Sequence, residues 1–200
     1  MIKYCIIGFL GVLLFSSCEK SKLNAKEYKE WYSENDNSLE SEKRIGEFIY
    51  KLKYLPVEAI ILEAIKNNPE VTRDELLKIQ EEQKDIQTFL FRIELDIKGA
   101  DPMKYQLKDQ IEYQKRVEYY SFIVKNDIFL VDGNDTLPCI IHHFERYYGS
   151  APYLNLMVGF KGTSNCNDKK LIYNDIVFNN GIIKLTINKE EIENIPELTI

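Results

Sequence analysis

Hydrophobic residues along this chain change their spacing, from a helical period in the first half to an alternating pattern later. The clearest helical pattern covers residues 56–69, where apolar side chains recur every three or four positions, at Val57, Ile60, Ile61, Ala64 and Ile65. Pro56 suits the first turn of this helix. A second helix is predicted to start at Thr72, because Glu75 three residues later completes a capping box. A third is predicted over residues 105–120.

Alternation of apolar and polar residues predicts the strands. Residues 45–54 alternate up to Pro56, and residues 88–97 place apolar side chains on one face and Arg92, Glu94 and Asp96 on the other. Asn180 and Gly181 predict a two-residue hairpin turn, and Asn188 with Glu191 a further capping box. After Ser121 the chain reads as strands and turns, at residues 122–124, 127–131, 136–148, 153–160, 170–178 and 182–188.

Helices in the first part and strands in the second indicate an α+β domain. About three helices from the N-terminal part are expected to pack on an antiparallel sheet that is built mostly from the C-terminal part. There is no repeat and no linker rich in Pro, Gly or Ser that would divide the chain.

The first eighteen residues carry a separate signal. Lys3 precedes an apolar run from Cys5 to Phe15, and the small residues Ser16 and Ser17 follow. As a helix the apolar run would extend for about 16 Å, whereas a bilayer core is about 30 Å thick. The run is therefore too short for a stable span and is typical of a signal peptide.

The Phe15-Ser16-Ser17-Cys18 stretch resembles the lipobox of bacterial lipoproteins, and its abrupt ending resembles lipoproteins of the Bacteroidota. Phe15 departs from the Leu that is usual there. The resemblance implies that cleavage precedes Cys18, that its thiol receives a diacylglyceryl group and that its new amine is acylated. A nucleophilic thiolate suits this alkylation, and more than one acyl chain gives lasting membrane attachment.

The resemblance divides the chain into three parts: a signal peptide at 1–17, a lipidated cysteine and tether at 18–26, and a single α+β globular domain at 27–200. It implies a lipid-anchored protein of the cell envelope, and because no Asp follows Cys18, outer-membrane delivery. Whether the domain faces the periplasm or the cell surface stays open.

Charge excludes some partners. The chain has 26 basic and 32 acidic side chains and a net charge of −6, so we expect no nucleic-acid partner and no attraction to an anionic membrane surface. Besides Cys18, an oxidising envelope would contain Cys139 and Cys166, which could form one disulfide.

The segment richest in residues that could bind a metal or act in catalysis contains Cys139, His142, His143 and Glu145. Strand alternation places His143 and Glu145 on one face about 6.6 Å apart, with His142 on the other face. Cys139 would share the face of His143 at about 13 Å, too far for a common zinc ion. We therefore expect no metal site here, and no cofactor.

Other catalytic signatures are weak. The sequence has no G-x-S-x-G turn and no phosphate-binding glycine loop. Asp132, Asn134 and Asp135 could bind calcium but lack the twelve-residue loop that such sites use, so this segment is expected to be a plain turn. If the protein is an enzyme, it would be a small envelope hydrolase that uses His143, Glu145 and Asp132.

Two further sequence features bear on the expected function: a glycosylation acceptor and a set of tyrosines. Asp135-Thr136-Leu137 resembles the acceptor for O-glycosylation in secreted Bacteroidota proteins, which implies a glycan on Thr136. Several tyrosines could line a surface that binds a glycan or a peptide: Tyr113, Tyr119, Tyr120, Tyr147, Tyr148 and Tyr153. The leading hypothesis is a non-catalytic, lipid-anchored domain that binds a protein or a glycan. The alternatives are the hydrolase and a structural subunit of an outer-membrane assembly.

Overall fold

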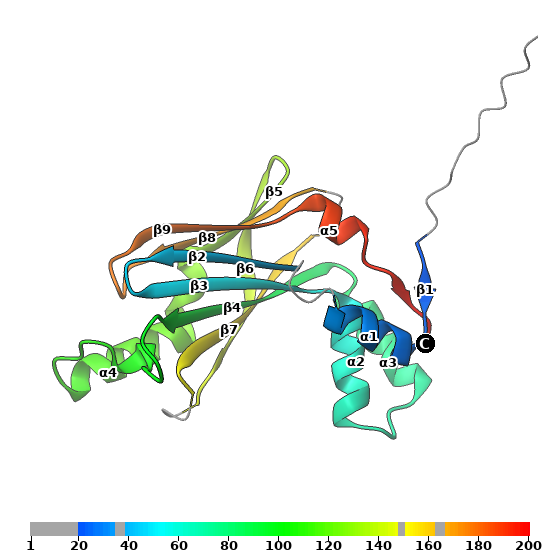
Figure 1. The fold of residues 1–200 in the computed structure, drawn as a ribbon, viewed down its shortest axis with the longest axis horizontal. Coiled ribbons are helices and arrows are strands. Elements are labelled where there is room, and N and C mark those ends of the chain that lie inside the picture. Colours follow the sequence, from blue (N-terminus) through cyan, green and yellow to red (C-terminus); the bar gives the residue numbers. More distant parts are fainter. Residues whose placement is uncertain (1–19, 35–38, 148–150, 163–166) are drawn as a thin grey trace, which may run out of the picture.

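The alternating segments form an eight-stranded antiparallel sheet in the computed structural model, which describes residues 20–34, 39–147, 151–162 and 167–200 (Figure 1). In space the strands follow the order β2-β3-β4-β7-β6-β5-β8-β9. The sheet curls until its two edge strands approach, and the backbone N–H of Thr186 on β9 donates to Ser41 Oγ on β2 at 3.2 Å. The strands are β2 (Glu40–Ile45), β3 (Phe48–Leu55), β4 (Ile86–Leu95), β5 (Ile128–Asp132), β6 (Asp135–Glu145), β7 (Tyr153–Lys161), β8 (Lys169–Asp175) and β9 (Gly181–Ile187).

Alternation along each strand fills the inside of this curl with apolar side chains. On β4 the predicted apolar face is buried at Phe89, Phe91 and Ile93, while Arg92 and Glu94 point outward. Phe91 packs against Tyr173 on the opposite side of the curl, with ring centroids 5.2 Å apart. Because large side chains occupy the interior, a ligand or partner would bind on the outer face of the sheet.

The helices lie at the ends of the sheet, with α1 (Ala25–Glu34), α2 (Val57–Asn67) and α3 (Arg73–Gln83) at one end and α4 (Gln110–Glu118) at the other (Figure 1). The predicted helices at α2 and α3 are confirmed. Thr72 caps α3 as expected: its hydroxyl accepts from Glu75 N, and its own N–H donates to the Glu75 carboxylate. Across the described residues, no helix is long and apolar enough to cross a membrane.

The α+β class is confirmed, but the division into N-terminal helices and a C-terminal sheet is only partial. Three strands, β2, β3 and β4, come before residue 96 and form one edge of the sheet. The sequence pattern missed β2 and α1, because their polar residues hide the apolar period: β2 has alternately exposed and half-buried positions, and α1 buries only Tyr28.

The segment expected to be a free tether takes part in the fold. Strand β1 (Lys22–Leu23) pairs in parallel with β10 (Glu197–Leu198), and α1 begins at Ala25. Backbone bonds hold the pair, from Glu197 N to Ser21 O at 2.9 Å and from Thr199 N to Leu23 O at 2.8 Å. The two strands are distant in the chain, so no local pattern could reveal the pairing. Cys18 lies outside the described residues.

Residues 122–124, predicted as a strand, are helical instead. A π-helical turn (Tyr119–Ile123) and a 3₁₀ turn, η4 (Val124–Asp127), continue α4 up to β5. Tyr120 and Val124 are fully buried, whereas Ile111, in the helix predicted over residues 105–120, is 66% exposed. The core contacts of this segment therefore begin at Val117 near the end of α4 and continue through the turns that follow it.

Two local predictions near the C-terminus are wrong. The β8–β9 connection is longer than a two-residue turn, because Asp175 pairs with Gly181. The Asp175 carboxylate accepts from Phe178 N at 3.0 Å and Asn180 Nδ2 at 3.2 Å, which stabilises the longer loop. Asn188 precedes α5 (Lys189–Glu193), but its side chain makes no capping hydrogen bond.

Candidate functional site

An open apolar groove lies between helix α2 and the outer face of the sheet. Its volume is about 380 Å³, within the usual range for ligand pockets. Its polar lining residues are Tyr32, Lys53, Glu63, Gln83 and Thr88. The apolar lining comes from α2 and four neighbouring strands: Ala59 and Ile60 on α2, Leu55 on β3, Leu90 on β4, Met157, Val158 and Gly159 on β7, and Ile141 on β6.

Strand register explains why these apolar side chains meet. Leu90 lies directly opposite Met157, so outward positions of β4 and β7 form one continuous floor. Gly159 lies opposite Ile141, and a Cβ at this glycine would stand 3.2 Å from Ile141 Cβ. Glycine therefore lets the Ile141 side chain pack closely over β7.

A second hollow continues the groove toward charged residues. It has a volume of about 290 Å³ and shares Lys53 and Leu90 with the apolar groove. Glu40, Lys51 and Arg92 line the remainder. A ligand that entered the groove would thus meet apolar surface at one end and charge at the other.

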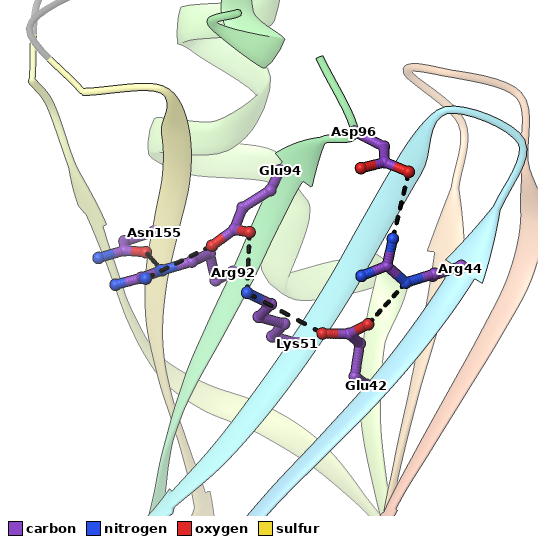
Figure 2. A network of polar contacts seen from close by, with 7 residues as sticks. All are labelled: Glu42, Arg44, Lys51, Arg92, Glu94, Asp96 and Asn155. Carbon is purple, nitrogen blue, oxygen red and sulfur yellow. Dashed lines mark hydrogen bonds and ion pairs between the residues drawn. The ribbon is translucent and has the colours of Figure 1, made fainter. Parts of the chain in front are cut away.

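The charged residues beyond the groove form a network across β2, β3, β4 and β7, which we call the paired face (Figure 2). Lys51 Nζ lies 2.9 Å from the Glu94 carboxylate and 4.0 Å from that of Glu42. Arg44 bonds Glu42 at 2.8 Å and Asp96 at 3.2 Å. Every cation that the figure draws therefore has a carboxylate partner, and the face is close to electrically neutral.

Arg92 joins this network to an aromatic pair at the edge of the site. Its Nε donates to Asn155 Oδ1 at 2.7 Å, and its guanidinium carbon lies 4.1 Å from the centre of the Tyr153 ring. Tyr153 meets Tyr147 edge to face at 5.2 Å. Cation–π contacts of this kind stabilise a partly buried arginine, so Arg92 is held in place.

The hydroxyl of Tyr147 is committed to its neighbours. It donates to the Glu145 carboxylate, and Asn155 Nδ2 donates to Glu145 Oε2 at 2.8 Å and to the Tyr147 hydroxyl at 3.1 Å. Burial, together with the hydrogen bond to Glu145, raises the pKa of Tyr147 to about 12. Tyr147 is therefore a neutral hydrogen-bond donor near neutral pH.

The structure separates the three residues proposed for a hydrolase. His143 and Glu145 lie on the outer face of β6, opposite Met157 and Asn155. Asp132 lies on the inner side of β5, opposite Asp135, and His143 is about 26 Å further along β6. Glu145 thus belongs to the site described above, His143 stands beside Met157 at its border, and Asp132 lies apart from it.

Asp132 has a structural partner instead. Lys169 Nζ lies 2.6 Å from its carboxylate, with Lys169 fully buried and the Asp132 side chain 7% exposed. Gln87 Nε2 donates to the same carboxylate at 2.9 Å. Burial opposes ionisation, but the hydrogen bonds from Lys169 and Gln87 outweigh it and lower the pKa of Asp132.

A bulge in β6 corrects the predicted orientation of Cys139. Cys139 pairs with Phe160 and Ile141 pairs with Gly159, so Ile140 is an extra residue in the strand. Cys139 therefore faces inward, away from His143, and burial raises the pKa of its thiol to about 11. Cys166 lies outside the described residues, so the disulfide stays a prediction. Within the described residues, no cluster of His, Cys, Asp and Glu is suited to hold a metal ion.

The remaining predicted residues are divided between core and surface. His142 faces the interior, with Nε2 2.8 Å from Ser121 O. Thr136 is exposed at the start of β6, beside the turn formed by Gly133, and its glycosylation stays a prediction. Of the six tyrosines, Tyr119 and Tyr120 are buried, Tyr113 is half-buried, Tyr147 and Tyr153 belong to the site, and Tyr148 lies outside the described residues.

No protein-family model matches the chain, and no curated protein matches its sequence. Among solved structures, a novel protein of unknown function from Burkholderia pseudomallei is similar over 86% of this chain and 93% of its own. The sequence identity is 10% and the TM-score is 0.41. A similarity this distant carries no inference about function.

Proposed function

We propose that this chain is a lipid-anchored protein of the cell envelope whose domain binds a partner protein in the apolar groove. The lipobox-like sequence ending at Cys18 supports the anchor. The groove between α2 and the outer face of the sheet is the observation that carries the binding role. On this proposal the protein acts by holding a partner beside a membrane, as a non-catalytic domain.

The chemistry of the groove favours a protein over a glycan. Leu90, Met157 and Ile60 offer apolar surface, which suits apolar side chains of a partner. Charged groups such as Lys53 and Glu63 stand beside them, and an apolar centre with a polar surround is the usual composition of a protein interface. A partner segment with apolar side chains on one face fits this arrangement.

A glycan would fit better at the edge, where Tyr147 and Tyr153 stand beside Glu145 and Asn155. In this structure the polar atoms there bond to one another. A sugar would have to replace those bonds, so we place the main binding site in the groove.

Photo-crosslinking tests the proposal. A photoreactive amino acid replaces Met157, which is 37% exposed on the groove floor, or Ile111 on α4, which is 66% exposed and distant from the groove. In the native host we expect a discrete crosslinked protein from position 157 and not from position 111. Adding Ile60→Glu, which places a charge in the groove wall, should abolish that product.

The matched control is Ile111→Glu, which adds the same charge outside the groove and should leave the product of position 157 intact. Circular dichroism checks that both variants fold. Equal crosslinking from positions 111 and 157, or a product that survives Ile60→Glu in a folded protein, would exclude the groove as the binding site.

A further inference from the structure

A second surface lies on the outer side of β5, β8 and β9 and the adjoining start of β6, and we call it the lysine face. Register defines its rows: Lys170 lies beside Val131 and Thr186, and Ile172 lies beside Phe129 and Lys184. None of these described outward positions is acidic. They are Thr136 and Pro138 on β6, Phe129 and Val131 on β5, Lys170, Ile172 and Asn174 on β8, and Ile182, Lys184 and Thr186 on β9.

Among the described residues, the two lysines of this face are not held in ion pairs, although Asp168 lines the same hollow as Lys170. Within the described part of the chain, neither Lys170 nor Lys184 makes an ion pair or a side-chain hydrogen bond. On the paired face, by contrast, Lys51 and Arg92 both contact Glu94. The fold has thus separated a small cationic surface from a chain whose net charge is −6.

Exposed apolar side chains lie among these lysines. Phe129 is 38% exposed and Ile182 on β9 is 60% exposed. Phe129 lies between Pro138 and Ile172 in register, so the apolar residues form a band across three strands. Cationic groups beside exposed apolar side chains are the combination that binds the surface of an anionic bilayer.

The curl of the sheet turns this face away from the groove. Because β9 approaches β2, the eight strands nearly encircle the core, and the strands of the lysine face, centred on β8, lie across it from the groove strands centred on β4, where Phe91 meets Tyr173. The outer faces of the two groups therefore point in opposite directions. A membrane on the lysine face would leave the apolar groove accessible to a partner.

We propose that the lysine face rests on an anionic phospholipid surface. This inference rests on the proposed lipid anchor: only three residues separate Cys18 from Lys22 in β1, and these four steps of chain reach at most about 14 Å. The anchor supplies attachment, and Lys170, Lys184 and the apolar band supply orientation. On this proposal the local charge of this face, and not the net charge of the chain, decides whether an anionic membrane attracts the protein.

Lysine acetylation, measured by mass spectrometry, tests the orientation. The native lipoprotein is made without glycosylation, because a glycan on Thr136 would stand at the edge of this face. It is placed in vesicles of phosphatidylglycerol or of phosphatidylcholine. On phosphatidylglycerol we expect the acetylation rates of Lys170 and Lys184 to fall at least fivefold, while Lys66 and Lys78, exposed on α2 and α3, keep theirs.

Neutral phosphatidylcholine vesicles and free inorganic phosphate should give little protection, which separates a bilayer surface from a free anion site. Phe129→Ser with Ile182→Ser should reduce the protection, and Ile111→Ser should not. Equal rates at all four lysines on phosphatidylglycerol would overturn the proposal, as would protection only by an acidic protein. A protein that stays in the supernatant would instead contradict the lipid anchor.

Discussion

The paired face and the lysine face are both outer faces of antiparallel strands, but among the described residues the cations of the first have carboxylate partners and those of the second do not. On the paired face, Lys51 and Arg92 lie within reach of the Glu94 carboxylate. On the lysine face, Lys170 and Lys184 have no such partner among the described residues. Charges that are paired locally cancel at a distance, whereas unpaired lysines leave a positive potential. Net charge therefore says little about what each surface of this molecule attracts.

The largest expected loss of stability comes from breaking the buried ion pair between Lys169 and Asp132. Its size is the standard against which the surface ion pairs are compared. Lys169→Met leaves the Asp132 carboxylate buried without its cation. Breaking a buried pair in this way costs about 3–5 kcal/mol of unfolding free energy. Urea denaturation at pH 7 measures it. Because the pKa of Asp132 is lowered in the folded protein, the stabilisation by this pair should decline as pH falls below 4. A loss under about 1 kcal/mol would show that the pair is not desolvated.

A smaller loss of stability is expected when the contacts of one cation on the paired face are removed. Arg92→Met removes the bond to Asn155, the contact with Glu94 and the stacking on Tyr153. We expect a loss of about 1–2 kcal/mol of unfolding free energy. Lys184→Met is the matched variant on the lysine face, and it should change stability by no more than about 0.5 kcal/mol. Equal losses in the two variants would contradict the distinction between the faces.

The smallest effect concerns a single half-buried carboxylate on α2. Glu58 in the first turn of α2 makes no ion pair within the described residues, and burial raises its pKa. The protonated form is therefore favoured by folding, and its stabilisation is lost as pH rises through the raised pKa. Glu58→Gln should raise the melting temperature by about 1–3 °C at pH 7.5 and have little effect at pH 4.

Glu63→Gln on the same helix is the control, because Glu63 is exposed and pairs with Lys66. It should not raise the melting temperature at either pH. An identical change for Glu58→Gln at both pH values would contradict a raised pKa for Glu58.

Local sequence pattern was sufficient where a residue's partners are its chain neighbours. It located α2, α3 and β4, because the apolar period and the Thr72–Glu75 cap are both short-range features. It failed where the partner is distant, as for β1 with β10. It also failed at Cys139, because one extra residue in β6 places Cys139 on the inner face of the strand while His143 stays on the outer face.

The candidate site was only partly predictable for the same reason. Alternation correctly placed His143 and Glu145 on one face and His142 on the other. The groove itself needs α2 and four strands that are not consecutive in sequence, so no single segment carries a signal for it. The contrast between Lys51 and Lys170 likewise depends on strand order, which decides whether a carboxylate stands beside each lysine.

Both proposed roles depend on attachment at Cys18, and the mass of the N-terminal peptide from protein extracted from native membranes tests this directly. We predict a peptide that begins at Cys18 and carries a diacylglyceryl group on sulfur and an acyl chain on the amine. A peptide that retains residues 1–17 without any lipid would contradict the account.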